Sequence, residues 1–193
     1  MAYINYDNKE IAFKIVYFGP GMSGKTTNLL HVHKALTGHT RSEMVVLDTE
    51  EERTLFFDFI PLELGMVEGF ALRFNLYTVP GQIHYEATRQ LILEGADGVV
   101  FVADSRPTEG ERNLESFRLM INNLLYYRED PTDFPLVLQY NKRDCERPIS
   151  TNSIQNELKT GPITCTEAVA TRGLGVMETL RDVSRMTVRR FQL

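Results

Sequence analysis

Cysteine is scarce in this sequence, and long apolar runs are absent from it. The two cysteines, Cys145 and Cys165, form neither a CxxC pair nor a cluster with metal-ligand spacing, so we expect reduced thiols. No stretch approaches the roughly 18 apolar residues that a membrane span needs. The polar start, with Ala2 at the second position, and the end at Leu193 match no signal peptide, myristoyl site or prenyl site. These absences predict a cytoplasmic protein with no membrane span and no lipid anchor.

An excess of positive charge is also missing. The chain of 193 residues has a formal net charge of -5, whereas nucleic-acid binding needs a concentrated positive surface. We therefore expect no nucleic acid among the partners, and we expect proteins instead. A chain of this length can bury a core without disulfides or a structural metal, and it fits a single domain over residues 1–193.

Apolar runs alternate with helix-period segments along most of the chain, the pattern of a mostly parallel sheet with helices on both faces. These segments span residues 11–18, 26–36, 84–95, 98–103, 113–127, 136–140, 153–158, 163–170 and 176–191. The region 55–77 breaks the rhythm, because two strand-like runs, residues 57–64 and 70–77, flank a glycine-containing segment. The sequence therefore predicts an α/β fold with one antiparallel hairpin, and a short extra strand is expected at residues 44–47.

Residues 19–26 contain the pattern GxxxxGK[ST] between a strand-like run and a helical segment. A polyphosphate needs closely spaced backbone N–H donors, glycines that let the main chain approach, and a lysine that offsets its charge. We therefore predict a phosphate-binding loop, with the Thr26 hydroxyl suited to Mg²⁺; a simple glycine turn is the alternative interpretation. The expected phosphate contacts here are Gly19, Pro20, Gly21, Met22, Ser23, Gly24, Lys25, Thr26 and Thr27.

A second motif favours guanine over adenine as the base. Asn141, Lys142 and Asp144 follow the apolar run 136–140, at the strand end where open α/β sheets bind ligands. A carboxylate at Asp144 can accept two parallel hydrogen bonds from guanine, from donors that adenine does not present on that edge. Lys142 can lie along the base plane, and Asn141 can tie this loop to the phosphate loop. Downstream, the Ala168 N–H is expected to donate to the guanine carbonyl oxygen. The alternative is a polar turn at a strand end.

Taken together, these motifs resemble small Ras-like GTPases, and in particular the MglA family of bacterial switches for cell polarity and gliding motility. The resemblance covers nearly the whole chain and is carried by residues 14–29, 53–59, 77–82, 98–105 and 139–144. It implies a phosphate-loop GTPase fold, with GTP as substrate, GDP as product and Mg²⁺ as cofactor. Thr78 departs from most relatives, which carry an aspartate there that holds a water on Mg²⁺. Because a hydroxyl supplies no negative charge, metal affinity is expected to depend more on Thr26 and the triphosphate.

The same resemblance assigns roles to four residues between the two motifs. Gly81 corresponds to the glycine whose N–H meets the γ-phosphate, and Gln82 to the residue that orients the attacking water. Thr54 corresponds to the threonine that reaches Mg²⁺ only when the triphosphate is bound. Arg53 corresponds to the arginine that offsets charge on the transferred phosphoryl group; a solvated charge beside Glu51 and Glu52 is the alternative.

The resemblance also implies partners, and it leaves rival functions to be separated. The expected regulator is an MglB-like roadblock homodimer that activates GTP hydrolysis, with effectors in motility or polarity, and the chain alone is expected to be a monomer. Partners would recruit it from the cytoplasm to the cell poles. One rival is a scaffold that binds GTP with little hydrolysis, which Gln82 and Arg53 disfavour. Another is an ATP-dependent enzyme, which Asp144 disfavours.

Two further sequence features have both a structural and a functional interpretation. Phe56, Phe57 and Phe59 crowd the first hairpin run, either as ordinary core alternation or, as the family resemblance implies, as part of a strand that slides with the nucleotide state. Arg181, Arg185 and Arg189 recur every fourth residue along the last helix. They either complement the charge at a helix C-terminus or form a dock for an acidic partner.

Overall fold

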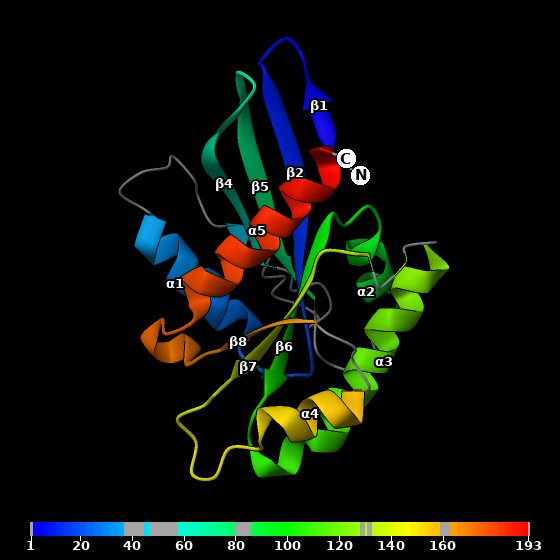
Figure 1. Cartoon of the computed structure of the whole chain (residues 1–193), viewed down its shortest axis with the longest axis vertical. Coiled ribbons are helices and arrows are strands. Elements are labelled where there is room, and N and C mark those ends of the chain that lie inside the picture. The colour runs from blue at the N-terminus through cyan, green and yellow to red at the C-terminus, as the bar shows by residue number, and fades with distance from the viewer. Residues whose placement is uncertain are drawn as a thin grey trace.

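The computed structural model describes residues 2–36, 45–46, 58–79, 86–127, 130, 133–158 and 163–192. Within these residues, eight strands form one sheet, and helices lie on both of its sides (Figure 1). The strands are β1 Tyr3–Asn5, β2 Glu10–Phe18, β3 Val45–Val46, β4 Asp58–Val67, β5 Phe70–Thr78, β6 Gly98–Asp104, β7 Leu136–Asn141 and β8 Thr164–Glu167. Their order across the sheet is β3-β4-β5-β2-β6-β7-β8, with β1 paired to β2 outside this path.

The parallel centre of the sheet is formed by β5, β2, β6, β7 and β8. Every residue of β6 and β7 is buried, as expected for parallel strands that are covered on both faces. Side chains of β2 alternate, because Phe13, Ile15 and Tyr17 join one core cluster while Val16 and Phe18 join the other. The sheet therefore separates two hydrophobic cores.

In the described part of the chain, five α-helices cover these two cores. The bounds are α1 Lys25–Leu36, α2 Glu86–Leu93, α3 Gly110–Tyr126, α4 Thr151–Leu158 and α5 Val176–Gln192. Buried side chains of α1 and α5 pack on one face, and those of α2, α3 and α4 pack on the other. The short 3-10 helices η2 Pro107–Glu109 and η3 Ala170–Arg172 follow β6 and β8. The predicted α/β class and the helices on both faces are confirmed.

The predicted hairpin is present as the antiparallel pair β4 and β5. Its turn is Glu68 and Gly69, both with positive φ (51° and 82°), which is the geometry of a two-residue type I′ turn. Gly65, which the sequence analysis placed in the turn, instead lies in β4, where the register shifts between Glu63 and Met66. Among the residues described, β3 pairs only with Asp58 and Phe59, so Pro61 lies beyond the paired part of β4.

Two short strands extend the antiparallel part of the sheet. β3 pairs with the start of β4, within the region where an extra strand was expected. β1 pairs antiparallel with residues 10–12 of β2 and was not predicted. It lies beside the first part of β2, before the point at Ile15 where β6 begins to pair with that strand.

Candidate nucleotide-binding site

The phosphate-loop motif lies between the end of β2 and the start of α1, as predicted. Gly19 has a φ of +146° and Gly24 a φ of +103°, conformations that other residues rarely adopt. A side chain at Gly19 would collide with the carbonyl oxygen of Val102 in β6, and one at Gly24 would collide with Nδ2 of Asn141. The loop therefore requires glycine at both positions for packing as well as for backbone conformation.

Lys25 lies on the inner side of this loop and is only 7% exposed. Its Nζ donates to the carbonyl oxygens of Gly19 at 3.0 Å and Pro20 at 2.8 Å. Thr26, the next residue of α1, is exposed. The ammonium group, the loop backbone and the helix N-terminus thus concentrate positive potential at one place, as an anion site requires.

Asn141 joins the phosphate loop to two other segments. Its Nδ2 donates to Ser23 O at 2.7 Å, and its Oδ1 accepts from the Ala170 N–H at 2.9 Å. The side chain is buried, so these bonds are shielded from water. The expected link from Asn141 to the phosphate loop is therefore present in the structure.

Lys142 makes a second link to the same loop. Its Nζ donates to Met22 O at 2.6 Å and to Oδ2 of Asp104 at 2.7 Å. Asp104 ends β6, is fully buried, and also accepts from Nη2 of Arg106 at 2.8 Å. Burial acts to raise the pKa of Asp104, but the hydrogen bonds from Arg106 and Lys142 outweigh it and the pKa lies below its ordinary value.

A pocket of about 320 Å³ opens between the phosphate loop and the loop that follows β7. It is lined by Met22, Gly24, Thr27, Asn141, Lys142, Asp144, Cys145, Val169, Ala170 and Thr171. The two motifs that the sequence analysis singled out therefore meet around one cavity, at the carboxyl ends of the parallel strands. Oδ2 of Asp144 lies 3.9 Å from Nη2 of Arg172, so the carboxylate faces the η3 segment.

The prediction for Ala168 is wrong in this structure. Its N–H donates to Tyr140 O at 2.8 Å and so belongs to the pairing of β7 with the segment after β8. The chain then turns into η3, and Val169, Ala170 and Thr171 line the pocket in its place. The predicted strand at 163–170 is shorter for the same reason, since β8 ends at Glu167.

Arg53, Thr54, Gly81 and Gln82 lie outside the residues that the structure describes, as do Phe56 and Phe57. Thr78 is described: it is the last residue of β5, is 3% exposed, and pairs in register with Tyr17 of β2. Since β2 leads directly into the phosphate loop, Thr78 is at the phosphate end of the sheet.

The described residues fit Mg²⁺ only in combination with bound phosphates. In this part of the chain, no group of three or more His, Cys, Asp or Glu side chains could hold a metal ion. Thr26 offers an exposed hydroxyl at the helix start, and Mg²⁺ usually keeps several waters and takes its remaining ligands from substrate phosphates. The donor set is thus compatible with a metal that arrives with the nucleotide.

Several residues that support the site carry no recognisable motif in the sequence. Asp104 was visible only as an acidic residue directly after an apolar run. Asn28 and Gln139 exchange two side-chain hydrogen bonds of 2.9 Å, and Nε2 of Gln139 also donates to Oγ1 of Thr179 at 2.9 Å. All three are fully buried. This network joins α1, β7 and α5.

The fold and the paired motifs define a phosphate-loop nucleotide-binding protein of the α/β class. The sequence matches the ADP-ribosylation factor family over residues 2–187. It is also 46% identical to the "Mutual gliding-motility protein MglA" of Myxococcus xanthus (strain DK1622) over 188 residues, which cover 97% of this chain and 96% of that protein. The chain therefore belongs to the ADP-ribosylation factor family of Ras-like small GTPases, enzymes that bind and hydrolyse GTP. The predicted family and activity are confirmed.

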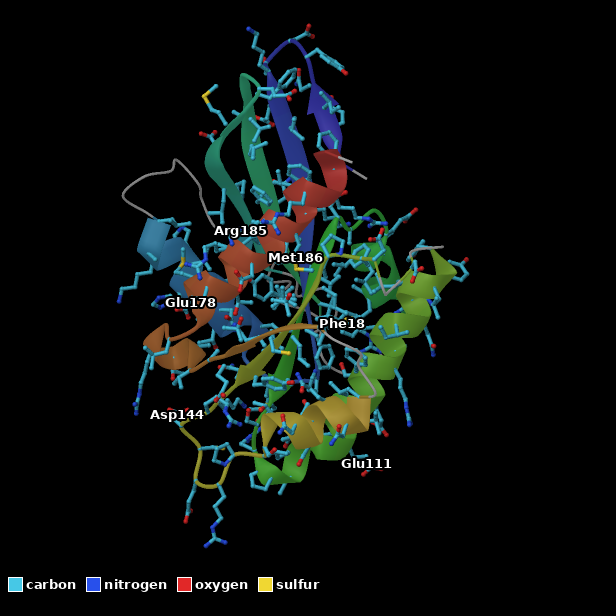
Figure 2. All side chains as sticks on the ribbon, viewed as in Figure 1. Phe18, Glu111, Asp144, Glu178, Arg185 and Met186 are labelled. Carbon is cyan, nitrogen blue, oxygen red and sulfur yellow. The ribbon has the colours of Figure 1, made fainter. Side chains whose placement is uncertain are left out.

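Two further observations concern surfaces outside the pocket. None of the helices in the described ranges is long and apolar enough to cross a membrane. Arg181, Arg185 and Arg189 of α5 are exposed and border a separate groove of about 540 Å³ between α5 and the β4–β5 hairpin. In Figure 2, Arg185 on α5 lies well away from Asp144 on the loop after β7.

Proposed function

We propose that the 320 Å³ pocket holds the guanosine part of GTP or GDP, with the phosphates on residues 19–27. The observation that supports this most strongly is the pair of bonds from Asn141 and Lys142 to carbonyl oxygens of the phosphate loop, at 2.7 Å and 2.6 Å. These bonds fix the base loop relative to the phosphate loop. Asp144 reads the guanine edge, Lys142 lies along the base, and the segment 169–171 supplies the backbone contact once expected from Ala168.

The test of this assignment is a change of base preference at Asp144. Asp144→Asn removes two charge-assisted hydrogen bonds to guanine, so GTP affinity should fall by about 3 kcal/mol, or over a hundredfold. Xanthosine triphosphate should gain affinity, because its 2-carbonyl can accept a hydrogen bond from the new amide. Glu146→Gln, an exposed carboxyl on the same loop, is the matched control and should bind GTP as the wild type does. A fluorescence titration in which Asp144→Asn keeps full GTP affinity would refute the guanine assignment.

The switch part of the proposal concerns residues beyond those described. Thr26 and Thr54 would hold Mg²⁺, which supplies charge neutralisation of the phosphates when bound. Gly81 would donate to the γ-phosphate and Gln82 would orient the attacking water. Arg53 would offset the developing charge. GTP would order these residues and hydrolysis would release them, which makes the protein a two-state switch.

Single-turnover hydrolysis with an MglB-like activating partner tests this catalytic set. An arginine of this kind accelerates related GTPases by about 10³ to 10⁵. Arg53→Ala and Gln82→Ala should each keep GTP and Mg²⁺ binding but lose most of the stimulated turnover. The double variant should be little worse than either single one, because residues that act as a unit have non-additive effects. The control is Arg118→Ala, on the exposed face of α3, which should be stimulated as the wild type is. If Arg53→Ala were also fully stimulated, the catalytic arginine would come from the partner.

The biological output that we propose is control of gliding motility or cell polarity. It rests on likeness to a protein whose name describes gliding motility, over nearly the full length of both chains. The partners would be an MglB-like roadblock homodimer and motility effectors, which would recruit a cytoplasmic monomer to the cell poles. Localising a fluorescent fusion in wild-type and partner-deleted cells tests this, since an unchanged pattern would contradict partner-dependent recruitment.

A further inference from the structure

Asp104 is a buried carboxylate that is paired with two cations, Lys142 and Arg106. Its Oδ2 accepts from Nζ of Lys142 at 2.7 Å and from Nη2 of Arg106 at 2.8 Å. Its Oδ1 accepts from the backbone N–H and the Nε of Arg106, both at 3.1 Å. The Asp104 side chain is 0% exposed, whereas the Lys142 and Arg106 side chains are 28% and 39% exposed. The carboxylate therefore joins one cation at the base loop to another on the loop before α3.

The backbone of Asp104 is fixed independently of these cations. Its N–H donates to Oδ1 of Asn113 at 2.9 Å, and its carbonyl oxygen accepts from Nδ2 of Asn113 at the same distance. With the main chain held by β6 and by Asn113 of α3, only the side-chain rotation of Asp104 is left to its partners. Arg106 sets that rotation through a forked contact that reaches both carboxylate oxygens.

We propose that Arg106 is a positioning residue for guanine nucleotide binding: it fixes the Asp104 carboxylate, which holds the Lys142 ammonium against the phosphate loop. The inference deepens the proposed function and rests on it. Without the Arg106 side chain, the carboxylate keeps Lys142 and the backbone N–H of residue 106 as partners, but it loses the fork that fixes both of its oxygens. Its rotation is then less restricted, so Lys142 is held less firmly at Met22 O. This loosening of Lys142 shortens the residence time of the bound nucleotide.

The experiment measures release of a fluorescent GDP analogue from the full chain after a chase with excess GDP. Arg106→Ala should release the analogue about fivefold to tenfold faster than the wild type, the size of an ordinary coupling between contacting residues. Arg106→Lys should lie in between, because a point charge replaces the fork. The matched control is Arg112→Ala: Arg112 lies in the first turn of α3, its side chain is 51% exposed, and it pairs with Glu109 at 2.9 Å. It should release at the wild-type rate.

A double-mutant cycle separates positioning from general destabilisation. In a Lys142→Ala background, adding Arg106→Ala should change the release rate less than about twofold, because the residue through which Arg106 acts is gone. An equal effect of Arg106→Ala in both backgrounds would overturn the inference. The inference would also be overturned if Arg106→Ala and Arg112→Ala released the GDP analogue at the same slow rate as the wild type. Failure of the wild type to prefer GDP over ADP is a different result, which overturns the proposed function and the inference together.

Discussion

At the scale of single residues, Gly24 shows how the phosphate loop constrains its own sequence. Its positive φ disfavours any side chain by about 1–2 kcal/mol, and a Cβ there would also displace the Asn141 amide. The bond from Asn141 to Ser23 O would then be lost from a buried site, at a further cost of about 1–3 kcal/mol. Gly24→Ala should therefore lower the free energy of unfolding by about 3 kcal/mol and abolish nucleotide binding, as measured by urea denaturation and titration.

Gly65 is the matched control for this prediction. It also has a positive φ, of +99°, but a Cβ there would meet nothing within 4 Å. Gly65→Ala should carry only the conformational cost of about 1–2 kcal/mol and should keep nucleotide affinity. Equal losses of stability in the two variants would show that contact with Asn141 does not matter.

The lowered pKa of Asp104 leads to a specific pH dependence of the free energy of unfolding. Its pKa in the folded protein lies below the ordinary value of 3.8, because hydrogen bonds from Arg106 and Lys142 overcome the effect of burial. A depressed carboxyl pKa contributes stability above the unfolded-state value, and this contribution is lost as pH falls through the folded-state value. The difference in unfolding free energy between wild type and Asp104→Asn should thus be constant from pH 7 to about 5 and shrink towards pH 3. If this difference in unfolding free energy grew on acidification, the hydrogen bonds from Arg106 and Lys142 would not stabilise the charged form of Asp104.

At the scale of elements, the sequence was sufficient where the signal is local. A loop such as 19–26 carries its geometry in adjacent residues, and β6 or β7 is a continuous apolar run. β1 could not be predicted in this way, because three residues show no periodicity. It forms because the first part of β2 extends beyond β6 and leaves backbone groups to be paired. The predicted contact of Ala168 with guanine was wrong for a related reason. Successive backbone N–H groups point in different directions, so a shift of one or two residues decides whether an N–H faces the sheet or the pocket.

The β4–β5 hairpin is the element in which a nucleotide-dependent movement is expected. Leu62 is 1% exposed while Glu63 is exposed, so a slip of β4 by one residue would exchange a buried apolar side chain for a charged one. The register shift between Glu63 and Met66 is a place where such a change can be absorbed without moving the turn. Hydrogen exchange should therefore differ across β4 between the GDP and GTP-analogue states. β7 provides an internal reference, and equal protection of β4 in both states would contradict the sliding strand.

At the scale of the whole molecule, the nucleotide pocket and the groove beside α5 lie at different places on the sheet. The carboxyl ends of the parallel strands carry the pocket, whereas α5 runs across the face that also carries α1 (Figure 1). The groove beside α5 has an apolar lining that includes Leu72, Phe74 and Leu180, and Arg181, Arg185 and Arg189 lie along it. Charge complementarity to a helix C-terminus explains basic residues near that end of α5, but Arg181 is in the second turn of the helix. A dock for an acidic protein partner would account for all three arginines, an interpretation that their replacement can test.

Replacing all three arginines tests this surface without touching the nucleotide site. Arg181, Arg185 and Arg189 changed together to Ala should leave GDP affinity unchanged, because none of the described residues lines both the groove and the nucleotide pocket. Partners retained from lysate at low salt should be lost from this variant, while the triple Lys variant, which keeps the charges, should retain them. High salt should remove the same partners from the wild type, since exposed charges are screened over roughly 10 Å at 0.1 M ionic strength. If the Ala and Lys variants retain the same partners but only the Ala variant is less stable, the arginines serve the helix alone.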